Sequence, residues 1–139
     1  MTSDGVALAA IVILLFPAGY FFLAAPAFLL VKLDIAEVTQ LLRGMFNAHF
    51  LMTSIAGAIG TMTFALTGRP AFAIGVALIA VFAVWARGWF LQRWDAELRA
   101  RDADDAAAVR RLHWGGMLCN AILLFAIVGS IPYVSATAA

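Results

Sequence analysis

Two histidines and one asparagine are the side chains of this sequence best suited to chemistry. His113, Gly116 and Asn120 are spaced three and four residues apart, so a helix would place them on one face. His49 lies in an earlier apolar run. A neutral imidazole can serve as a general base, and a side-chain amide can stabilise developing negative charge. Because polar groups at membrane depth are costly unless they face protein, we expect these side chains to point inward.

Composition indicates that these residues lie in a membrane. Hydrophobic residues make up 65% of the 139 residues, and charged residues make up 12%. Soluble domains have about 45–50% apolar and about 25% charged residues. Four apolar runs, about 6–31, 45–66, 71–91 and 112–134, are each long enough to cross a bilayer. We therefore predict an all-α integral membrane protein: an antiparallel four-transmembrane-helix bundle forming a single domain over residues 1–139.

The basic residues predict an orientation. Connectors 32–44 and 92–111, with the adjoining helix ends, contain eight of the nine basic residues: Lys32, Arg43, Arg87, Arg93, Arg99, Arg101, Arg110 and Arg111. Only Arg69 lies at the opposite end. Basic loops stay in the cytoplasm, so both connectors should be cytoplasmic and both termini non-cytoplasmic, in a bacterial inner membrane. We expect an aromatic belt at the cytoplasmic boundary, formed by Trp85, Trp89, Trp94 and Trp114.

Several local patterns predict how the helices pack. Pro17 and Pro26 should kink the first span, with neighbouring helices satisfying the freed carbonyl groups. Ala56 and Gly60 match a small-xxx-small pattern that allows close helix approach. Cys119 is the only cysteine, so no intramolecular disulfide can form, and we expect it to be a small buried hydrophobe.

The third span should continue as a helix into water. Its opposite charges four residues apart predict ion pairs along one helix. The expected pairs are Arg93 with Glu97, Asp95 with Arg99, and Glu97 with Arg101.

Polar residues from several spans share one predicted depth. Together they could form a ligand pocket that opens to the cytoplasm, lined by Asn47, His49, Arg87, His113 and Asn120, with Tyr20 between the two prolines. Simpler interpretations remain open. Arg87 can extend to lipid phosphates, His113 can lie among headgroups, and His49 or Asn120 can simply hydrogen-bond a neighbouring helix.

Metal and transport chemistry can be assessed in the same way. His49 and His113 on facing helices could ligate haem iron axially, or copper. Zinc or copper sites usually need three or four ligands, and Cys119 is the only thiolate candidate. The four spans contain no Asp or Glu, which argues against a proton-coupled transporter built on carboxylates. No phosphate-binding loop, hydrolase triad or nucleic-acid motif is present.

Three segments carry a family resemblance. They are the run from Phe21 to Phe28, the segment Met45-Phe46-Asn47-Ala48-His49-Phe50, and Arg111-Leu112-His113 followed by Asn120. The chain resembles the transmembrane protein 205-like family of small four-span proteins and the related anthrone-oxygenase-like proteins. The resemblance implies a four-helix membrane bundle and, for the oxygenase-like relatives, a cofactor-free reaction of oxygen with a polycyclic phenol. It implies His113 and Asn120 as the residues of interest, and the chain departs from the pattern at Gly115-Gly116.

These observations favour one function and leave two alternatives. The first expectation is a non-catalytic accessory subunit or small hydrophobic-ligand binder, with the lipid bilayer and a larger membrane complex or a second copy as partners. The first alternative is a membrane enzyme acting on an aromatic or quinone-like substrate. In that enzyme His113 or His49 would be the base, and Asn120 with Arg87 would stabilise negative charge. The second alternative is a haem- or copper-handling protein that uses His49 and His113.

Overall fold

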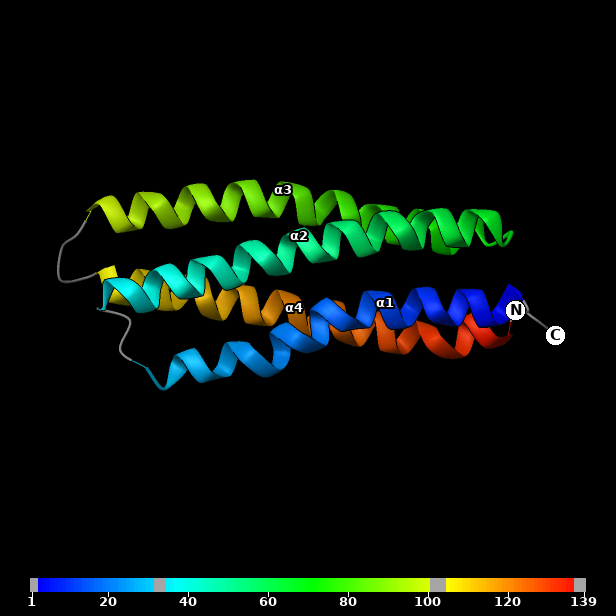
Figure 1. Ribbon diagram of the computed structural model, residues 1–139, viewed down its shortest axis with the longest axis horizontal. Coiled ribbons are helices and arrows are strands. Elements are labelled where there is room, and N and C mark those ends of the chain that lie inside the picture. The colour runs from blue at the N-terminus through cyan, green and yellow to red at the C-terminus, as the bar shows by residue number, and fades with distance from the viewer. Residues whose placement is uncertain (1–2, 32–34, 101–104, 137–139) are drawn as a thin grey trace.

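The computed structural model is a bundle of four long helices (Figure 1). It describes residues 3–31, 35–100 and 105–136. The α-helices are α1 (Ser3–Ala24), α2 (Ala36–Leu66), α3 (Pro70–Ala100) and α4 (Asp105–Ala136), and a short 3₁₀ helix, η1 (Ala25–Leu29), follows α1. Four helical segments are long and apolar enough to cross a membrane: Asp4–Leu29, Ala36–Leu66, Pro70–Arg99 and Ala107–Val134. The predicted all-α membrane architecture is therefore confirmed.

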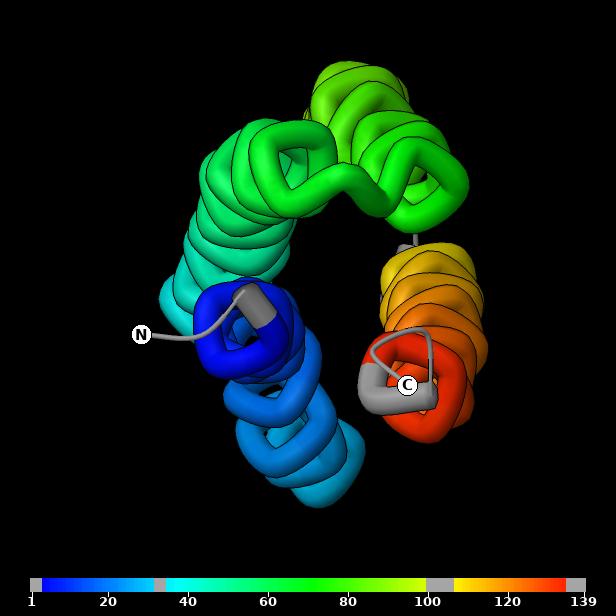
Figure 2. The backbone as a smooth tube through the Cα atoms, turned by 90° about the vertical axis from the view of Figure 1, so that its right-hand side faces the viewer, coloured from blue at the N-terminus to red at the C-terminus, as the bar shows by residue number. Residues whose placement is uncertain are grey.

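The four helices run along the long axis of the molecule (Figure 1). The first turn of α1, the α2–α3 turn and the last turn of α4 lie together at one end (Figure 1). Viewed from that end, the four helices surround a common axis (Figure 2). The interface between α2 and α3 is the most extensive, and α1 packs against both α2 and α4. The interface between α3 and α4 is much smaller.

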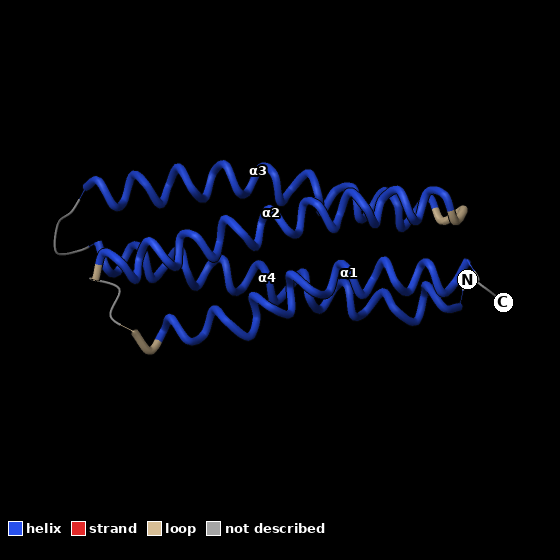
Figure 3. Tube along the Cα trace, viewed as in Figure 1, coloured by secondary structure: helices blue, strands red, loops and turns tan. Residues whose placement is uncertain are grey.

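Most of both predicted connectors is helical (Figure 3). α2 begins at Ala36, ahead of the apolar run that starts near residue 45, and α3 runs on to Ala100. The helices thus extend two to three turns beyond the apolar runs. Charged side chains on these extensions can lie in water while the backbone remains hydrogen-bonded within the helix.

The two prolines of the first span have different effects. Pro17 lies inside α1, which continues through it to Ala24. Pro26 falls in the first turn of η1, where the chain changes from α-helical to 3₁₀ hydrogen bonding. Because proline has no N–H, it cannot continue the α-helical ladder at that point. The predicted distortion is therefore strongest at Pro26.

Small residues allow α2 and α3 to approach closely. A Cβ atom placed on Gly57 would lie 2.8 Å from the Cβ of Ala80, and one on Gly60 would lie 3.1 Å from Cγ1 of Val76. Gly57 and Gly60 therefore allow the two helices to approach closely, and Gly60 belongs to the predicted small-xxx-small pattern. The α2–α3 turn needs a glycine too, because Gly68 adopts a φ of +73°.

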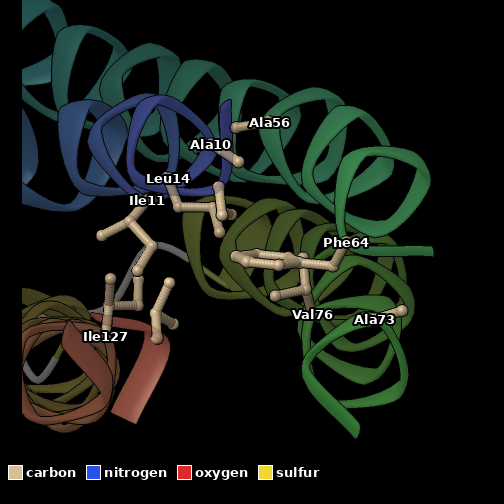
Figure 4. Packing of buried hydrophobic residues seen from close by; sticks show 10 residues of the cluster. Ala10, Ile11, Leu14, Ala56, Phe64, Ala73, Val76 and Ile127 are labelled. Atoms are coloured by element: carbon tan, nitrogen blue, oxygen red, sulfur yellow. The ribbon is translucent and has the colours of Figure 1, made fainter. Parts of the chain in front are cut away.

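Buried hydrophobic side chains form two clusters. One lies near the α2–α3 turn and includes Ile11, Leu14, Phe64 and Ile127 (Figure 4). The other lies toward the connector end and is aromatic: Phe21, Phe46, Phe50, Phe90 and Trp94.

Trp94 corrects the predicted aromatic belt. Its side chain is fully buried, whereas Trp85, Trp89 and Trp114 are 62%, 52% and 55% exposed. The indole packs on the rings of Phe46 and Phe90. Trp94 is therefore a core residue, because it faces α2 while the other three tryptophans face outward.

Ion pairs connect helices at both ends of the bundle. Arg69 donates to the Asp4 carboxylate at 2.6 Å and to the Val134 carbonyl at 2.7 Å. At the other end, Arg43 of α2 makes a bidentate pair with Asp95 of α3, at 2.7 and 2.8 Å.

The pairs predicted within α3 have mixed outcomes. Arg93 contacts Glu97 at 3.0 Å, as predicted. Asp95 was expected to pair with Arg99, but its direct bidentate partner is Arg43 of α2, and Arg99 adds only a weaker attraction. The expected Glu97–Arg101 pair lies outside the described residues.

Candidate functional site

Three polar side chains from α2 and α4 converge on the backbone of the first span. His49 Nδ1 lies 3.2 Å from the Pro17 carbonyl oxygen, and His113 Nε2 lies 3.0 Å from the Ala25 carbonyl oxygen. Asn120 Nδ2 donates to the Ala18 carbonyl oxygen at 2.9 Å. All three side chains are at most 5% exposed, as expected for a polar face that points inward.

These acceptors differ from the expected ones. Pro17 and Pro26 remove the donors for the carbonyls four residues earlier, those of Ile13 and Phe22. The histidines and Asn120 instead bond the carbonyls of Pro17, Ala18 and Ala25. Ala25 stands where α-helical hydrogen bonding changes to 3₁₀, which leaves its carbonyl accessible to a side chain.

The carbonyl partners fix the protonation of each ring. A carbonyl oxygen only accepts, so His49 must carry its proton on Nδ1 and His113 on Nε2. His49 Nε2 and His113 Nδ1 are then lone-pair acceptors. The same reasoning sets the Asn120 amide: its nitrogen faces Ala18, and its Oδ1 faces away as an acceptor.

Asn47 and Arg87 form a separate pair. Arg87 Nε donates to Asn47 Oδ1 at 2.8 Å, which joins α3 to α2. The two residues do lie at one depth, as predicted. The structure nevertheless divides the expected single pocket, because the two histidines and Asn120 are turned toward α1. Tyr20 is 51% exposed and lies on an outward face of α1.

Aromatic rings connect the two histidines. The His49 ring centroid lies 4.3 Å from Phe21, and Phe21 lies 4.9 Å from Phe46. The Phe46 ring in turn contacts His113 edge-on at 5.7 Å. Gly116 makes room for Phe46, because a Cβ atom at Gly116 would overlap the phenyl ring. The imidazoles are thus linked through packed phenylalanines rather than aimed directly at one another.

A cavity of about 240 Å³ lies between α2, α3 and α4, and we call it the inner cavity. His49, Thr53 and Asn120 supply its polar lining, and Phe50, Phe82 and Leu123 are among its apolar walls. Thr53 and Asn120 are 4% and 2% exposed. Within the described part of the chain, Thr53 Oγ1 and Asn120 Oδ1 have no hydrogen-bond partner. Two residues of the cavity lining thus carry buried hydrogen-bonding atoms that have no partner among the described residues.

Sequence reasoning gave Thr53 no role and misjudged Cys119. Thr53 follows His49 by four residues, and this helical spacing was a usable signal. Cys119 was expected to be buried, but it is exposed and lines the inner cavity. The expectation was wrong because Cys119, one residue before Asn120, faces the loosely packed side of α4 that borders α3.

The donor set bears on metal binding. Among residues with described side chains, no three His, Cys, Asp or Glu residues cluster closely enough to hold a metal ion. His113 Nδ1 is buried and has no hydrogen-bond partner among the described residues, and His113 does not line the inner cavity. Axial haem ligation would need the imidazoles of His49 and His113 to face one space. The phenyl rings of Phe21 and Phe46 instead link the two imidazoles.

Comparison with known proteins found no matching family model, no matching curated protein and no matching solved structure.

Proposed function

We propose that this chain is a small integral membrane protein that binds an apolar molecule carrying a hydroxyl or N–H donor in the inner cavity. The helices would cross a bacterial inner membrane as an antiparallel bundle, with both termini on the non-cytoplasmic side. The positive-inside distribution of basic residues supports this orientation. We also expect the chain to act as an accessory subunit, associated with a larger membrane complex or a second copy. Its resemblance to the transmembrane protein 205-like family likewise stays an expectation.

The Asn120 carbonyl oxygen is the observation that carries the proposal. Asn120 lines the inner cavity and its amide nitrogen is committed to Ala18, so Oδ1 is the acceptor that this side chain has left. A buried acceptor without a donor is destabilising by about 1–3 kcal/mol. A bound molecule with a donor would remove this penalty, and Thr53 Oγ1 and His49 Nε2 offer further polar contacts in the same cavity.

The walls and size of the inner cavity support a small apolar ligand. Ligand sites are mostly apolar with a few placed polar groups, and drug-sized ligands occupy about 300–1,000 Å³. At about 240 Å³, the inner cavity suits a molecule of one or two rings. Phe50 and Phe82 provide aromatic faces for such rings.

A matched pair of probes tests the proposal. Cys119 lines the cavity, so occupancy should slow its alkylation by N-ethylmaleimide in detergent solution. We expect 1-naphthol to protect Cys119 at lower concentration than 1-methoxynaphthalene, which has no donor. Thr53→Val should weaken protection by 1-naphthol about fivefold, because a hydrogen bond contributes about 1 kcal/mol.

Thr61→Val is the matched control. It makes the same change on the same helix, and Thr61 bonds the Gly57 carbonyl rather than lining the cavity. Equal protection by both naphthalenes, or equal effects of the two valine variants, would refute a donor-selective site. Native mass spectrometry of the same sample tests the accessory role separately, because an accessory subunit should retain a second polypeptide in fixed stoichiometry.

His49 favours a second candidate function, a cofactor-free membrane enzyme. Its Nδ1 proton is held by Pro17, so Nε2 carries a lone pair, and the residue lines the cavity. A neutral imidazole in contact with substrate can accept a proton as general base. In this arrangement His49 rather than His113 would be the base. Asn120 could stabilise negative charge only through its second N–H, since Oδ1 is an acceptor.

His49→Asn separates catalysis from folding. The asparagine amide can replace Nδ1–H as the donor to Pro17 but has no atom in place of the Nε2 base. With 1,8-dihydroxynaphthalene, a two-ring phenol, as probe, oxygen uptake should exceed the protein-free rate and fall to that rate in His49→Asn. Thermal stability should change little. Unchanged turnover in a folded His49→Asn variant would rule out this base.

A further inference from the structure

A second and larger cavity lies between α3 and α4, and we call it the outer groove. Its volume is about 470 Å³, and it shares four lining residues with the inner cavity: Phe50, Phe82, Gly116 and Cys119. Trp85, Trp89, Phe90 and Leu112 are among its apolar walls. The groove exists because α3 and α4 pack together much less extensively than α2 and α3 do.

Three charged side chains line the connector end of the outer groove: Arg93, Glu97 and Arg111. Arg93 and Glu97 pair at 3.0 Å and so neutralise each other. Arg111 makes no ion pair with any side chain that the structure describes. Among the described side chains, the groove therefore ends in one guanidinium group without an ionic partner, next to an aromatic and aliphatic interior.

We propose that the outer groove binds one anionic phospholipid, with an acyl chain between α3 and α4 and the phosphate on Arg111. A guanidinium binds phosphate oxygens through two parallel N–H donors. From Arg111 to Cys119 the helix rises by about 12 Å at 1.5 Å per residue, so the groove extends well below the charged rim. The structure thus pairs a phosphate-binding cation with a channel for hydrocarbon.

The surroundings favour a lipid over a soluble anion. Trp85 and Trp89 are more than half exposed, and tryptophan is enriched at the headgroup level of membranes. Basic pockets between membrane helices on the cytoplasmic side bind anionic headgroups. A free phosphate would gain nothing from the apolar walls. Thr53 and Asn120, which are polar residues of the inner cavity, do not line the outer groove, so the lipid preference in the test below reports on this site separately from the inner-cavity ligand.

Native mass spectrometry of the full chain released from lipid nanodiscs tests the site. With an equimolar mixture of phosphatidylglycerol and phosphatidylcholine, we expect the first retained lipid to be phosphatidylglycerol. Arg111→Gln should reduce that preference about fivefold, since one basic residue near an anionic surface contributes about 1 kcal/mol. Arg110→Gln is the matched control, because Arg110 is an exposed neighbour that does not line the groove.

The proposal would be overturned by the absence of a preference between the two lipids, or by equal effects of the two glutamine variants. A wild-type measurement keeps the test valid if Arg111→Gln fails to fold. An acyl chain that reaches the far end should cover Cys119, so nanodiscs of phosphatidylglycerol should slow its alkylation by N-ethylmaleimide relative to phosphatidylcholine. Equal alkylation rates would also overturn it.

Discussion

At the residue scale, one backbone segment determines what the polar side chains can do. His49, His113 and Asn120 each give a donor to a carbonyl of the first span, at 2.9–3.2 Å. Each therefore turns an acceptor in another direction: His49 Nε2, His113 Nδ1 and Asn120 Oδ1. The two histidines differ in surroundings, since His49 lines a cavity and His113 is fully buried against Phe46.

This difference predicts a structural role for His113. A glutamine at this position can place its side-chain nitrogen where Nε2 lies and keep the donor to Ala25, whereas leucine cannot. We expect His113→Leu to destabilise the protein by about 1–3 kcal/mol, because a buried carbonyl loses its side-chain donor. His113→Gln should retain most of the stability. Reversible unfolding in mixed micelles measures both changes.

The contradicting outcome is specific. If His113→Leu unfolds like the wild type while losing ligand binding or turnover, then His113 acts in the site and not in the packing of α4 on α1. Equal destabilisation by leucine and glutamine would show that the ring contact with Phe46 matters more than the hydrogen bond.

Particular residues show why the site could be predicted only in part. The spacing of His113 and Asn120 predicted an inward polar face, because helical periodicity can be recognised from residue spacing alone. Their partners are backbone carbonyls, which every residue carries and which therefore leave no signature. Trp94 and Cys119 were assigned from residue type and depth alone. Which way each faces depends on helix rotation, and that is set by packing against Phe46 and by the sparse α3–α4 contact.

At the element scale, α2 and α3 form the most extensive helix–helix interface of the bundle. Gly57 and Gly60 let the two helices meet along their apolar length, and Arg43 with Asp95 joins their charged extensions. The apolar spans could be predicted because length and hydropathy are local properties. The pairing of Asp95 across helices could not, because both an intrahelical and an interhelical arginine were available to it.

A double-mutant cycle on Arg43 and Asp95 measures the contribution of that pair. The two side chains are 35% and 41% exposed, so water screens their attraction despite the bidentate geometry. We expect a coupling free energy of unfolding below about 1 kcal/mol from Arg43→Gln, Asp95→Asn and the double variant. A coupling of several kcal/mol would show that the pair is shielded from water.

At the scale of the whole molecule, the polar groups are distributed unevenly across the proposed membrane. Arg87, His113 and the outer groove lie toward the connector end, whereas Arg69 and Asp4 lie at the end that holds the first turn of α1 and the last turn of α4. The four-helix architecture follows directly from composition. The sides of the membrane follow only from the basic residues, which makes the orientation a separate prediction.

Reporter fusions test the proposed orientation. Alkaline phosphatase fused to the C-terminus should be active and a green fluorescent protein fused there should be dark, because that end is expected outside the cytoplasm. Fusions inserted in the connector between α3 and α4 should give the reverse pattern. Fluorescence from the C-terminal fusion would invert the topology and place the outer groove in the other leaflet.

Arg69 has a consequence for how the bundle is assembled during synthesis. Its guanidinium binds Asp4, near the start of the chain, and the Val134 carbonyl, near the last turn of α4. Synthesis proceeds from the N-terminus, so Asp4 and Arg69 exist together well before Val134 emerges from the ribosome. The acidic partner can therefore neutralise the arginine while three helices are already in the lipid, and the fourth helix supplies the final acceptor on arrival.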